Sequence, residues 1–291
     1  LDKFILFLKF ELRLSDNTVK SYSNDLNKYL SFLSSKNKKI ESIGYNDIRE
    51  YVVFLSKKKH KASSINRNIS SIKRFHLYLL DCNVITTNPS DLLEFQKNRR
   101  NFPDTLSVVE IEKIFDSIKT DNFIGMRDLS MLTLLYSSGL RVSELVDLQL
   151  SNIFFSEEYI KIIGKGNKER LVPIGLKAQK HLTIYINNAR NQIGKKKDAK
   201  GYAYLSYRSK KMTRMAVFNV IKKYCLLSGI NKKVSPHTFR HSFATHMLEG
   251  GADLRVVQEL LGHESISTTE IYTHLDRIYL KEVHKLCHPR G

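Results

Sequence analysis

Hydrophobic residues recur every three to four positions through most of the first hundred residues, which is the period of an α-helix. Four helices are predicted there: residues 1–14, a second beginning after Ser15, then 46–58 and 63–81. The last of these carries one apolar stripe, formed by Ile65, Ile69, Ile72, Phe75 and Leu79. A stripe of this kind is typical of a helix that packs one face on a core. The pattern therefore predicts an all-helical first domain over residues 1–97.

The helical period is interrupted by the segment QKNRRNFPDT, residues 96–105, which has three basic residues and Pro103. A polar, proline-containing segment without periodicity is typical of a linker between domains. Ser107 and Glu110 then have the spacing of a capping box, which predicts a new helix. We expect a linker over residues 98–105 and a second domain over 106–291.

Two runs rich in β-branched residues, 159–163 and 170–174, are separated by a glycine-containing turn in the second domain. They predict an antiparallel hairpin. Helical spacing predicts the remaining elements at about 126–138, 177–192, 213–228, 237–249, 254–261 and 278–286. The expected fold is mainly α, with a small antiparallel β-sheet in the second domain.

Charge adds a candidate partner to this picture. The 291 residues include 48 Lys and Arg against 29 Asp and Glu, a formal net charge of +19. Such an excess lies mostly at the surface and attracts polyanions, so double-stranded DNA is the expected partner, although a lysine-rich proteome would give a similar value. Three scattered cysteines and the lack of any apolar run of about 18 residues predict a cytoplasmic chain that does not interact with membranes.

The polar face of the fourth predicted helix carries Arg67, Lys73 and Arg74. Side chains of this type make many of the backbone contacts in protein–DNA complexes, so these residues are candidate DNA-binding residues. The alternative is an ordinary solvated helix face.

Several residues of the second domain suit phosphate chemistry. Arg141 follows a predicted helix end, and Lys165 lies between two glycines at the tip of the predicted hairpin. His237 and Arg240 lie on one face of a helix that begins near Pro236. The histidine spacing in this segment also occurs in zinc sites, but an arginine on the same face repels a cation, so an oxyanion site is favoured and no metal is expected.

His263 follows another predicted helix, and Tyr272 comes nine residues later. A tyrosine can act as a covalent nucleophile where cations stabilise its phenolate and the phosphate that it attacks. Most tyrosines are packing residues, and this chain has 14 of them. The conjunction of two arginines, a lysine and two histidines around one phosphodiester and one tyrosine is what favours phosphoryl transfer by positioning and charge.

Four segments, GLRVSEL, GKGNKERLVP, SPHTFRHSFATHML and LGHESISTTEIYTH, resemble the tyrosine recombinase, or phage integrase, family. Within it they are most similar to the bacterial Xer recombinases, and the tail HPRG resembles the XerD branch. The intervals between the candidate residues agree with the family pattern. The similarity of the first domain is looser than that of the second.

The resemblance implies a role for each residue. Tyr272 would attack the scissile phosphate and form a 3′-phosphotyrosyl link, while Arg141 and Arg240 would hold the non-bridging oxygens. Lys165 would be the general acid for the leaving 5′-oxygen, and His237 and His263 would hydrogen-bond the phosphate. Glu144 would support the arginine from behind. No cofactor is implied.

The resemblance also implies an architecture, in which the two domains form a clamp around DNA and four protomers join two duplexes. A sibling Xer recombinase and a cell-division DNA translocase are implied as partners. The last helix would dock on a neighbouring protomer through Leu280, Val283 and Leu286; the alternative is that it folds back on its own domain.

Two other functions stay open on the sequence alone. The implied role is resolution of chromosome dimers at a dif-like site, but an integrase of a mobile element carries the same catalytic motifs. A DNA-binding regulator without catalysis would also be basic and helical. A regulator needs side chains that contact bases, whereas this residue set is centred on a phosphate.

Overall fold

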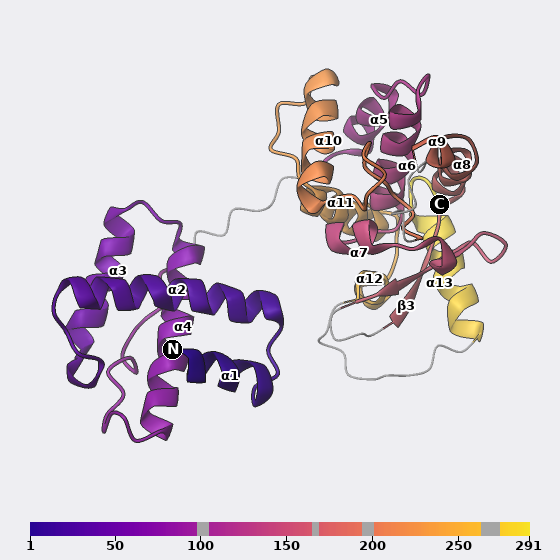
Figure 1. The fold of residues 1–291 in the computed structure, drawn as a ribbon. Coiled ribbons are helices and arrows are strands. Elements are labelled where there is room, and N and C mark those ends of the chain that lie inside the picture. The colour runs from indigo at the N-terminus through magenta and orange to yellow at the C-terminus, as the bar shows by residue number, and fades with distance from the viewer. Residues whose placement is uncertain (98–104, 165–168, 194–200, 263–273) are drawn as a thin grey trace. The chain divides into compact units, whose positions relative to one another are not determined.

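The computed structural model describes residues 1–97, 105–164, 169–193, 201–262 and 274–291, with the side chains of 274–277 left out. The chain divides into two compact units, Leu1–Asn101 and Phe102–Gly291 (Figure 1). Each unit has its own cluster of buried hydrophobic residues, so each is described by itself.

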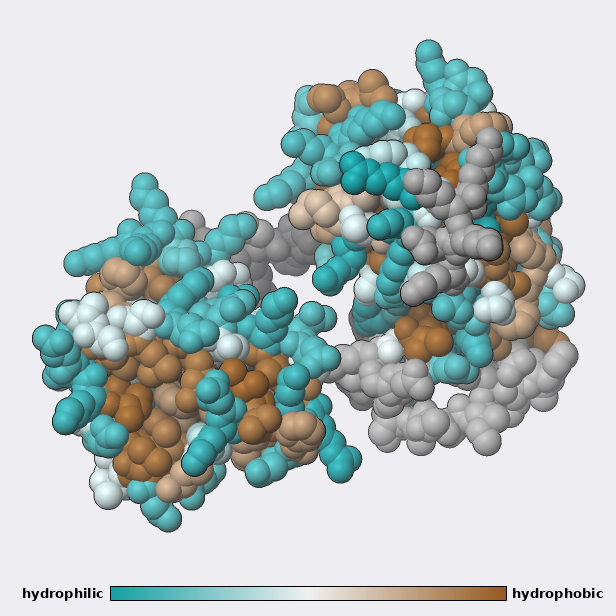
Figure 2. Space-filling view, viewed as in Figure 1, coloured by the Kyte–Doolittle hydropathy of each residue, from teal (hydrophilic) through white to brown (hydrophobic). Residues whose placement is uncertain are grey.

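Residues 1–97 form a bundle of helices. They comprise α1 (Asp2–Phe10), α2 (Asp16–Ser35), the 3₁₀ helix η1 (Ile40–Ser42), α3 (Tyr45–Lys57) and α4 (Ala62–Asp81). The apolar stripe predicted for α4 is confirmed, because all five of its residues are buried. Helix α2 begins as expected, with the Ser15 hydroxyl accepting a hydrogen bond from the Thr18 amide. Hydrophobic residues also reach the surface on the face of this unit seen in Figure 2.

The described part of the second unit is mainly helical. Its helices are α5 (Val108–Asp116), α6 (Phe123–Ser137), α7 (Val142–Asp147), η2 (Leu150–Asn152), α8 (Leu176–Ile184), η4 (Tyr185–Arg190), α9 (Asn191–Ile193), α10 (Arg214–Leu227), α11 (Pro236–Glu249), α12 (Leu254–Leu261) and α13 (His274–Cys287). The capping box predicted at α5 is present: the Ser107 hydroxyl accepts from the Glu110 amide and the Glu110 carboxylate accepts from the Ser107 amide.

A three-stranded antiparallel sheet accompanies these helices, in the order β1 (Ile153–Phe154), β2 (Tyr159–Ile163), β3 (Glu169–Pro173). Strands β2 and β3 pair from Tyr159 with Pro173 to Ile163 with Glu169, as a hairpin requires. The predicted fold class, mainly α with a small antiparallel sheet, is confirmed. Strand β1 was not predicted, because two residues are too few to show an alternating pattern.

Several predicted helix ends differ from the structure. Helix α1 ends at Phe10 instead of residue 14, and Arg13 has a φ of 48°, which no α-helix continues through. Helix α6 begins at Phe123 instead of residue 126, because the Asn122 side chain caps it by accepting from the Gly125 amide. The predicted helix 177–192 is present, but six of its residues form the π-helical segment η4.

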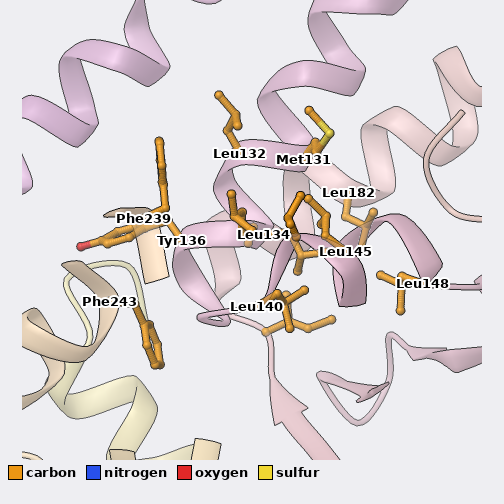
Figure 3. Close-up of a cluster of buried hydrophobic side chains, with 14 of the residues drawn as sticks. Met131, Leu132, Leu134, Tyr136, Leu140, Leu145, Leu148, Leu182, Phe239 and Phe243 are labelled. Carbon is orange, nitrogen blue, oxygen red and sulfur yellow. The ribbon is translucent and has the colours of Figure 1, made fainter. Parts of the chain in front are cut away.

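The core of the second unit is built around α6 (Figure 3). Its residues Met131, Leu132, Leu134 and Tyr136 are fully buried against side chains of α7, α8 and α11. Because α6 is buried nearly all round, its end at Gly139 is fixed tightly. A Cβ on Gly139 would lie 2.5 Å from the Phe243 ring, and the φ of this residue is 55°. The position at which the chain turns from the core toward Arg141 is therefore fixed by the packing of Gly139.

Helix α13 folds back on its own unit, where it contacts α11 and β3. Leu280 is buried there and Val283 packs against the core, whereas Leu286 is exposed. His284 Nε2 donates to the Ser137 carbonyl at 2.6 Å, and Arg290 forms an ion pair with Glu112. In this single chain, Leu280 and Val283 are thus not free to dock on a neighbour. None of the helices in the described ranges is both long and apolar enough to cross a membrane.

Candidate active site

Arg141 is the residue that precedes α7, and Glu144 fixes it in place. The Glu144 carboxylate accepts from the Arg141 amide at 2.8 Å and from its Nη1 at 2.9 Å. Glu144 thus supplies the N3 half of a capping box, because its carboxylate accepts from the N-cap amide, and it also forms an ion pair with the side chain of the N-cap residue. The Arg141 side chain keeps 38% of its surface exposed, so part of its guanidinium faces solvent.

Helix α11 begins at Pro236 after a cap by Ser235, and it carries the next two candidates. His237 is exposed in the first turn, whereas Arg240, one turn later, is buried. Arg240 Nη1 donates to the Gly139 carbonyl at 2.7 Å, and Nη2 donates to the Leu261 carbonyl at 2.6 Å. Arg240 therefore joins the end of α6 to the end of α12.

The carboxyl end of α12 accepts from three arginines on three different elements. Arg170 of β3 donates to the Leu260 carbonyl at 3.1 Å, Arg240 to Leu261, and Arg141 to Gly262 at 3.1 Å. The last carbonyls of a helix have no partner within the helix and lie at the negative end of its dipole, so cations are favoured there. Gly262 itself closes the helix with a φ of 65°.

Glu144 is shared by the same three arginines. Arg170 forms two hydrogen bonds of 2.9 Å with its carboxylate, and Arg240 Nη1 lies 3.9 Å from Glu144 Oε2. Three positive charges against one negative charge give these four side chains a sum of +2. A mostly buried group in which the cations exceed the anions is arranged for an additional anion.

The pKa shifts in this cluster follow from burial and charge. Burial alone raises the pKa of the Glu144 carboxyl, but the hydrogen bonds and charge of Arg170, with those of Arg141, outweigh it and hold the pKa below its usual value. Burial, followed by repulsion from Arg141, lowers the pKa of Arg240 to about 10. Arg240 thus remains charged at neutral pH, in surroundings that disfavour its charge.

The structure brings together Arg141, Glu144 and Arg240, which are predicted site residues from two separated segments. Lys165, His263 and Tyr272 lie outside the described residues. In sequence, Lys165 comes two residues after the end of β2, and His263 directly follows Gly262. Among the described residues, no group of three or more His, Cys, Asp or Glu side chains is placed to hold a metal ion.

Arg170 is a member of the cluster that the sequence analysis missed. Strand alternation places it on the same face of β3 as Val172, and both residues are buried. A charged residue at an inward position of a short strand was the signal available in the sequence.

The candidate DNA-binding residues of α4 have different surroundings. Arg67 Nε and Nη2 donate to the fully buried Asp25 carboxylate at 2.7 and 3.0 Å. Lys73 Nζ donates to the Asp91 carbonyl at 3.2 Å, while Arg74 is exposed. Arg67 thus has a structural partner already, and Arg74 has the more accessible charge.

Comparison with known proteins identifies the class to which this fold and arginine cluster belong. The phage integrase family matches residues 104–277, and the N-terminal SAM-like domain of phage integrases matches residues 1–83. The chain belongs to this family, the site-specific tyrosine recombinases.

Within the family the chain belongs to the XerD branch. It is 43% identical to tyrosine recombinase XerD of Chlorobaculum tepidum, over 100% of this chain and 96% of the relative. It is 39% identical to XerD of Oceanobacillus iheyensis, over 100% and 98% of the two chains.

Solved structures share the fold. The XerA recombinase is 30% identical, covers 97% of this chain and 96% of its own, and gives a TM-score of 0.52. The XerH site-specific recombinase, in its post-cleavage complex with a palindromic difH substrate, is 20% identical and gives a TM-score of 0.72, over 97% and 82% of the two chains.

Proposed function

We propose that this chain cuts and rejoins double-stranded DNA at a specific site through a covalent 3′-phosphotyrosyl link at Tyr272. The observation that carries the proposal is the arginine cluster with its sum of +2, placed at the residue that precedes His263. A scissile phosphate supplies the additional anion. Arg141 and Arg240 bind its non-bridging oxygens and stabilise the charge that develops on them in the transition state.

The remaining site residues act on protons. The Tyr272 hydroxyl oxygen attacks the phosphorus, and the bond to the 5′-oxygen breaks. Lys165 gives a proton to that leaving oxygen, while His237 and His263 hydrogen-bond the phosphate and assist removal of the tyrosine proton. Because one phosphodiester is exchanged for another, the bond energy is kept, and a 5′-hydroxyl from the partner strand reverses the step. The reaction therefore needs no nucleotide as an energy source.

The two domains, residues 1–97 and 106–291, hold the DNA between them in this proposal. Exchange of both strands between two duplexes needs four cuts, and with one nucleophile in each protomer this requires four protomers. A sibling Xer recombinase within that tetramer and a cell-division DNA translocase that triggers cutting are the partners that this function predicts.

The proposed role is the resolution of chromosome dimers at a dif-like site. It is supported by relatives named XerD that align with the whole chain, whereas the catalytic motifs alone fit a mobile-element integrase equally well. Selection of fragments from the genomic DNA of the native host by this chain, followed by mapping of the selected site, separates the two roles. A single chromosomal site supports dimer resolution, and sites at the ends of mobile elements support integration.

The chemistry is tested by trapping the covalent intermediate on a nicked duplex that carries the selected site. The wild type should form a protein–DNA adduct on a denaturing gel, and Tyr272→Phe should form none. Tyr279→Phe is the matched control, because Tyr279 is an exposed tyrosine on α13. An adduct with Tyr272→Phe would assign the nucleophile to another residue. A wild-type chain that binds the site without forming an adduct would favour a regulator if the adduct is also absent when the sibling recombinase and the translocase are added.

A further inference from the structure

Arg170 is held more completely than either arginine proposed to bind the phosphate. Its relative exposure is 7%, both of its terminal nitrogens donate to Glu144 at 2.9 Å, and its Nε donates to the Leu260 carbonyl. The fork of the guanidinium matches the carboxylate, which is the strongest geometry for such a pair. Arg170 is therefore committed to the protein, whereas Arg141 retains exposed surface.

The position of Arg170 also fixes the end of α12. A Cβ on Gly262 would lie 3.1 Å from Cδ and Nη1 of Arg170, so the chain passes directly over the guanidinium at the residue before His263. On its other side Arg170 lies in β3, which is paired along its length with β2. One side chain thus connects the hairpin, the Glu144 carboxylate and the last turn of α12.

We propose that Arg170 is a positioning residue for the recombination reaction: it neutralises Glu144, so that Arg141 and Arg240 stay available to the scissile phosphate. This inference rests on the proposed function and assigns to Arg170 no contact with DNA. The physical reason lies in the shared carboxylate. Glu144 accepts two hydrogen bonds from Arg170, and its Oε1 also accepts one from Arg141 Nη1.

Without Arg170, the buried carboxylate would keep Arg141 as its hydrogen-bonded partner, with Arg240 3.9 Å away. A buried carboxylate draws its remaining cation closely, because water cannot replace the lost partner. Arg141 would then be bound to Glu144 in place of the phosphate. The loss should appear in the cleavage step and not in DNA affinity, which depends on many phosphate contacts along the duplex.

Single-turnover cleavage of the nicked duplex, with the full-length chain at saturating concentration, tests this role. Arg170→Met should cleave on the order of 100-fold more slowly than the wild type, with an unchanged Kd for the duplex, because small displacements of positioned groups cost about this factor. Arg170→Lys keeps the charge but lacks the planar fork, so its cleavage rate should lie between those of the wild type and Arg170→Met. This variant replaces Arg170→Met in the test if the methionine variant does not fold.

Arg127→Met is the matched control. Arg127 is equally buried, forms an ion pair with Asp128 and donates to the Leu205 carbonyl, but none of these partners belongs to the arginine cluster. Arg127→Met should lower the thermal midpoint to a similar extent as Arg170→Met and leave the cleavage rate of the folded chain unchanged. A general loss of packing would affect the two variants alike.

A second substitution gives the decisive readout. In the Arg170→Met background, Glu144→Gln removes the uncompensated charge and should raise the cleavage rate by at least about tenfold, whereas in the wild-type background it should lower the rate. Equal cleavage by folded Arg170→Met and Arg127→Met, or a further fall on adding Glu144→Gln, would overturn the positioning role. A wild-type chain that forms no adduct even with the sibling recombinase and the translocase added would overturn the proposed function, and this inference with it.

Discussion

The arginine cluster of the second unit differs from the buried polar pairs of the first unit. In the first unit, Asp25 pairs with Arg67, the Tyr29 hydroxyl forms a hydrogen bond of 2.9 Å with His76 Nε2, and the Tyr51 hydroxyl donates to Asn68 at 3.1 Å. In the second unit, three arginines converge on Glu144 and on one helix end. Balanced pairs serve the stability of the fold, because each charge or polar atom has its partner within the protein. An unbalanced cluster is stable only with support from its surroundings, and it is arranged to bind a further charged group.

The pKa shifts sharpen this contrast. Burial lowers the pKa of His76 to about 4, so that histidine is neutral at pH 7 and the first unit carries no unpaired charge at this position. Burial also lowers the pKa of Arg240, but only to about 10, so its charge remains. The second unit thus keeps a buried positive charge at neutral pH. Arg240 donates to the Gly139 and Leu261 carbonyls in the absence of a bound anion.

The largest effect is expected from a substitution that removes one arginine of the unbalanced cluster. Arg240→Ala should lower the rate of single-turnover cleavage on the order of 1000-fold, because the variant loses a positioned cationic donor to the transition state. Affinity for the duplex should change little. Arg240→Lys is the control, since it keeps the charge and loses the fork. A loss below about tenfold in folded Arg240→Ala would contradict the role given to the cluster.

Breaking a balanced pair should affect stability instead. Arg67→Ala leaves the fully buried Asp25 carboxylate without its cation, which should lower the free energy of unfolding by about 2 kcal/mol, below the usual cost for a buried pair because Arg67 is half exposed. Urea denaturation of the full-length chain measures this change. The cleavage rate at saturation should stay at the wild-type value, and a large fall in the folded variant would place Arg67 in the chemistry.

Accessible charges of the first unit should affect only DNA affinity. Arg74→Ala removes an exposed guanidinium on α4 and should reduce the slope of log K against log salt by about 1, with a loss of a few-fold in affinity. Titrations at several salt concentrations give this slope. The same slope for the wild type and the variant would show that Arg74 contacts no phosphate.

The last expected effect concerns pH. His76 has a folded-state pKa of about 4 against 6.5 for the unfolded chain, so the unfolded state binds more protons between these values. The stability that neutral His76 contributes is fully present above pH 6.5 and is lost as the pH falls toward 4. His76→Gln keeps a donor or acceptor for Tyr29 but cannot titrate, and its thermal midpoint should fall less steeply over this window. Parallel curves for the two proteins would contradict the assignment.

Local patterns predicted the parts of the fold that depend on neighbouring residues. The stripe of α4 and the capping box of Ser107 follow from helical spacing and were confirmed. Helical spacing also selected Arg240, the position after a predicted helix end suggested Arg141, and the family resemblance implied Glu144. Spacing did not predict that Arg240 would bridge Gly139 and Leu261, 101 and 21 residues away, because such contacts depend on the packing of whole helices.

Arg170 and Arg67 illustrate what local patterns miss. Arg67 looks like a surface charge in the sequence, and the inward position of Arg170 does not show its partner; the carboxylates that pair with Arg170 and Arg67 lie 26 and 42 residues away. A partner at that distance has no periodic signal, so a buried ion pair and a solvated arginine look the same before the fold is known. The two-residue strand β1 was missed for the related reason that it depends on pairing with β2.

The central claim is that Arg141 and Arg240 act on the negative charge of the scissile phosphate. The most direct measurement compares Arg240→Ala with the wild type on two nicked duplexes, one with the natural phosphate and one with an uncharged methylphosphonate at the scissile position. If the arginine balances charge, the deficit of the variant should shrink by at least about tenfold on the methylphosphonate. An equal deficit on both duplexes would contradict the claim and assign Arg240 a role in the fold alone.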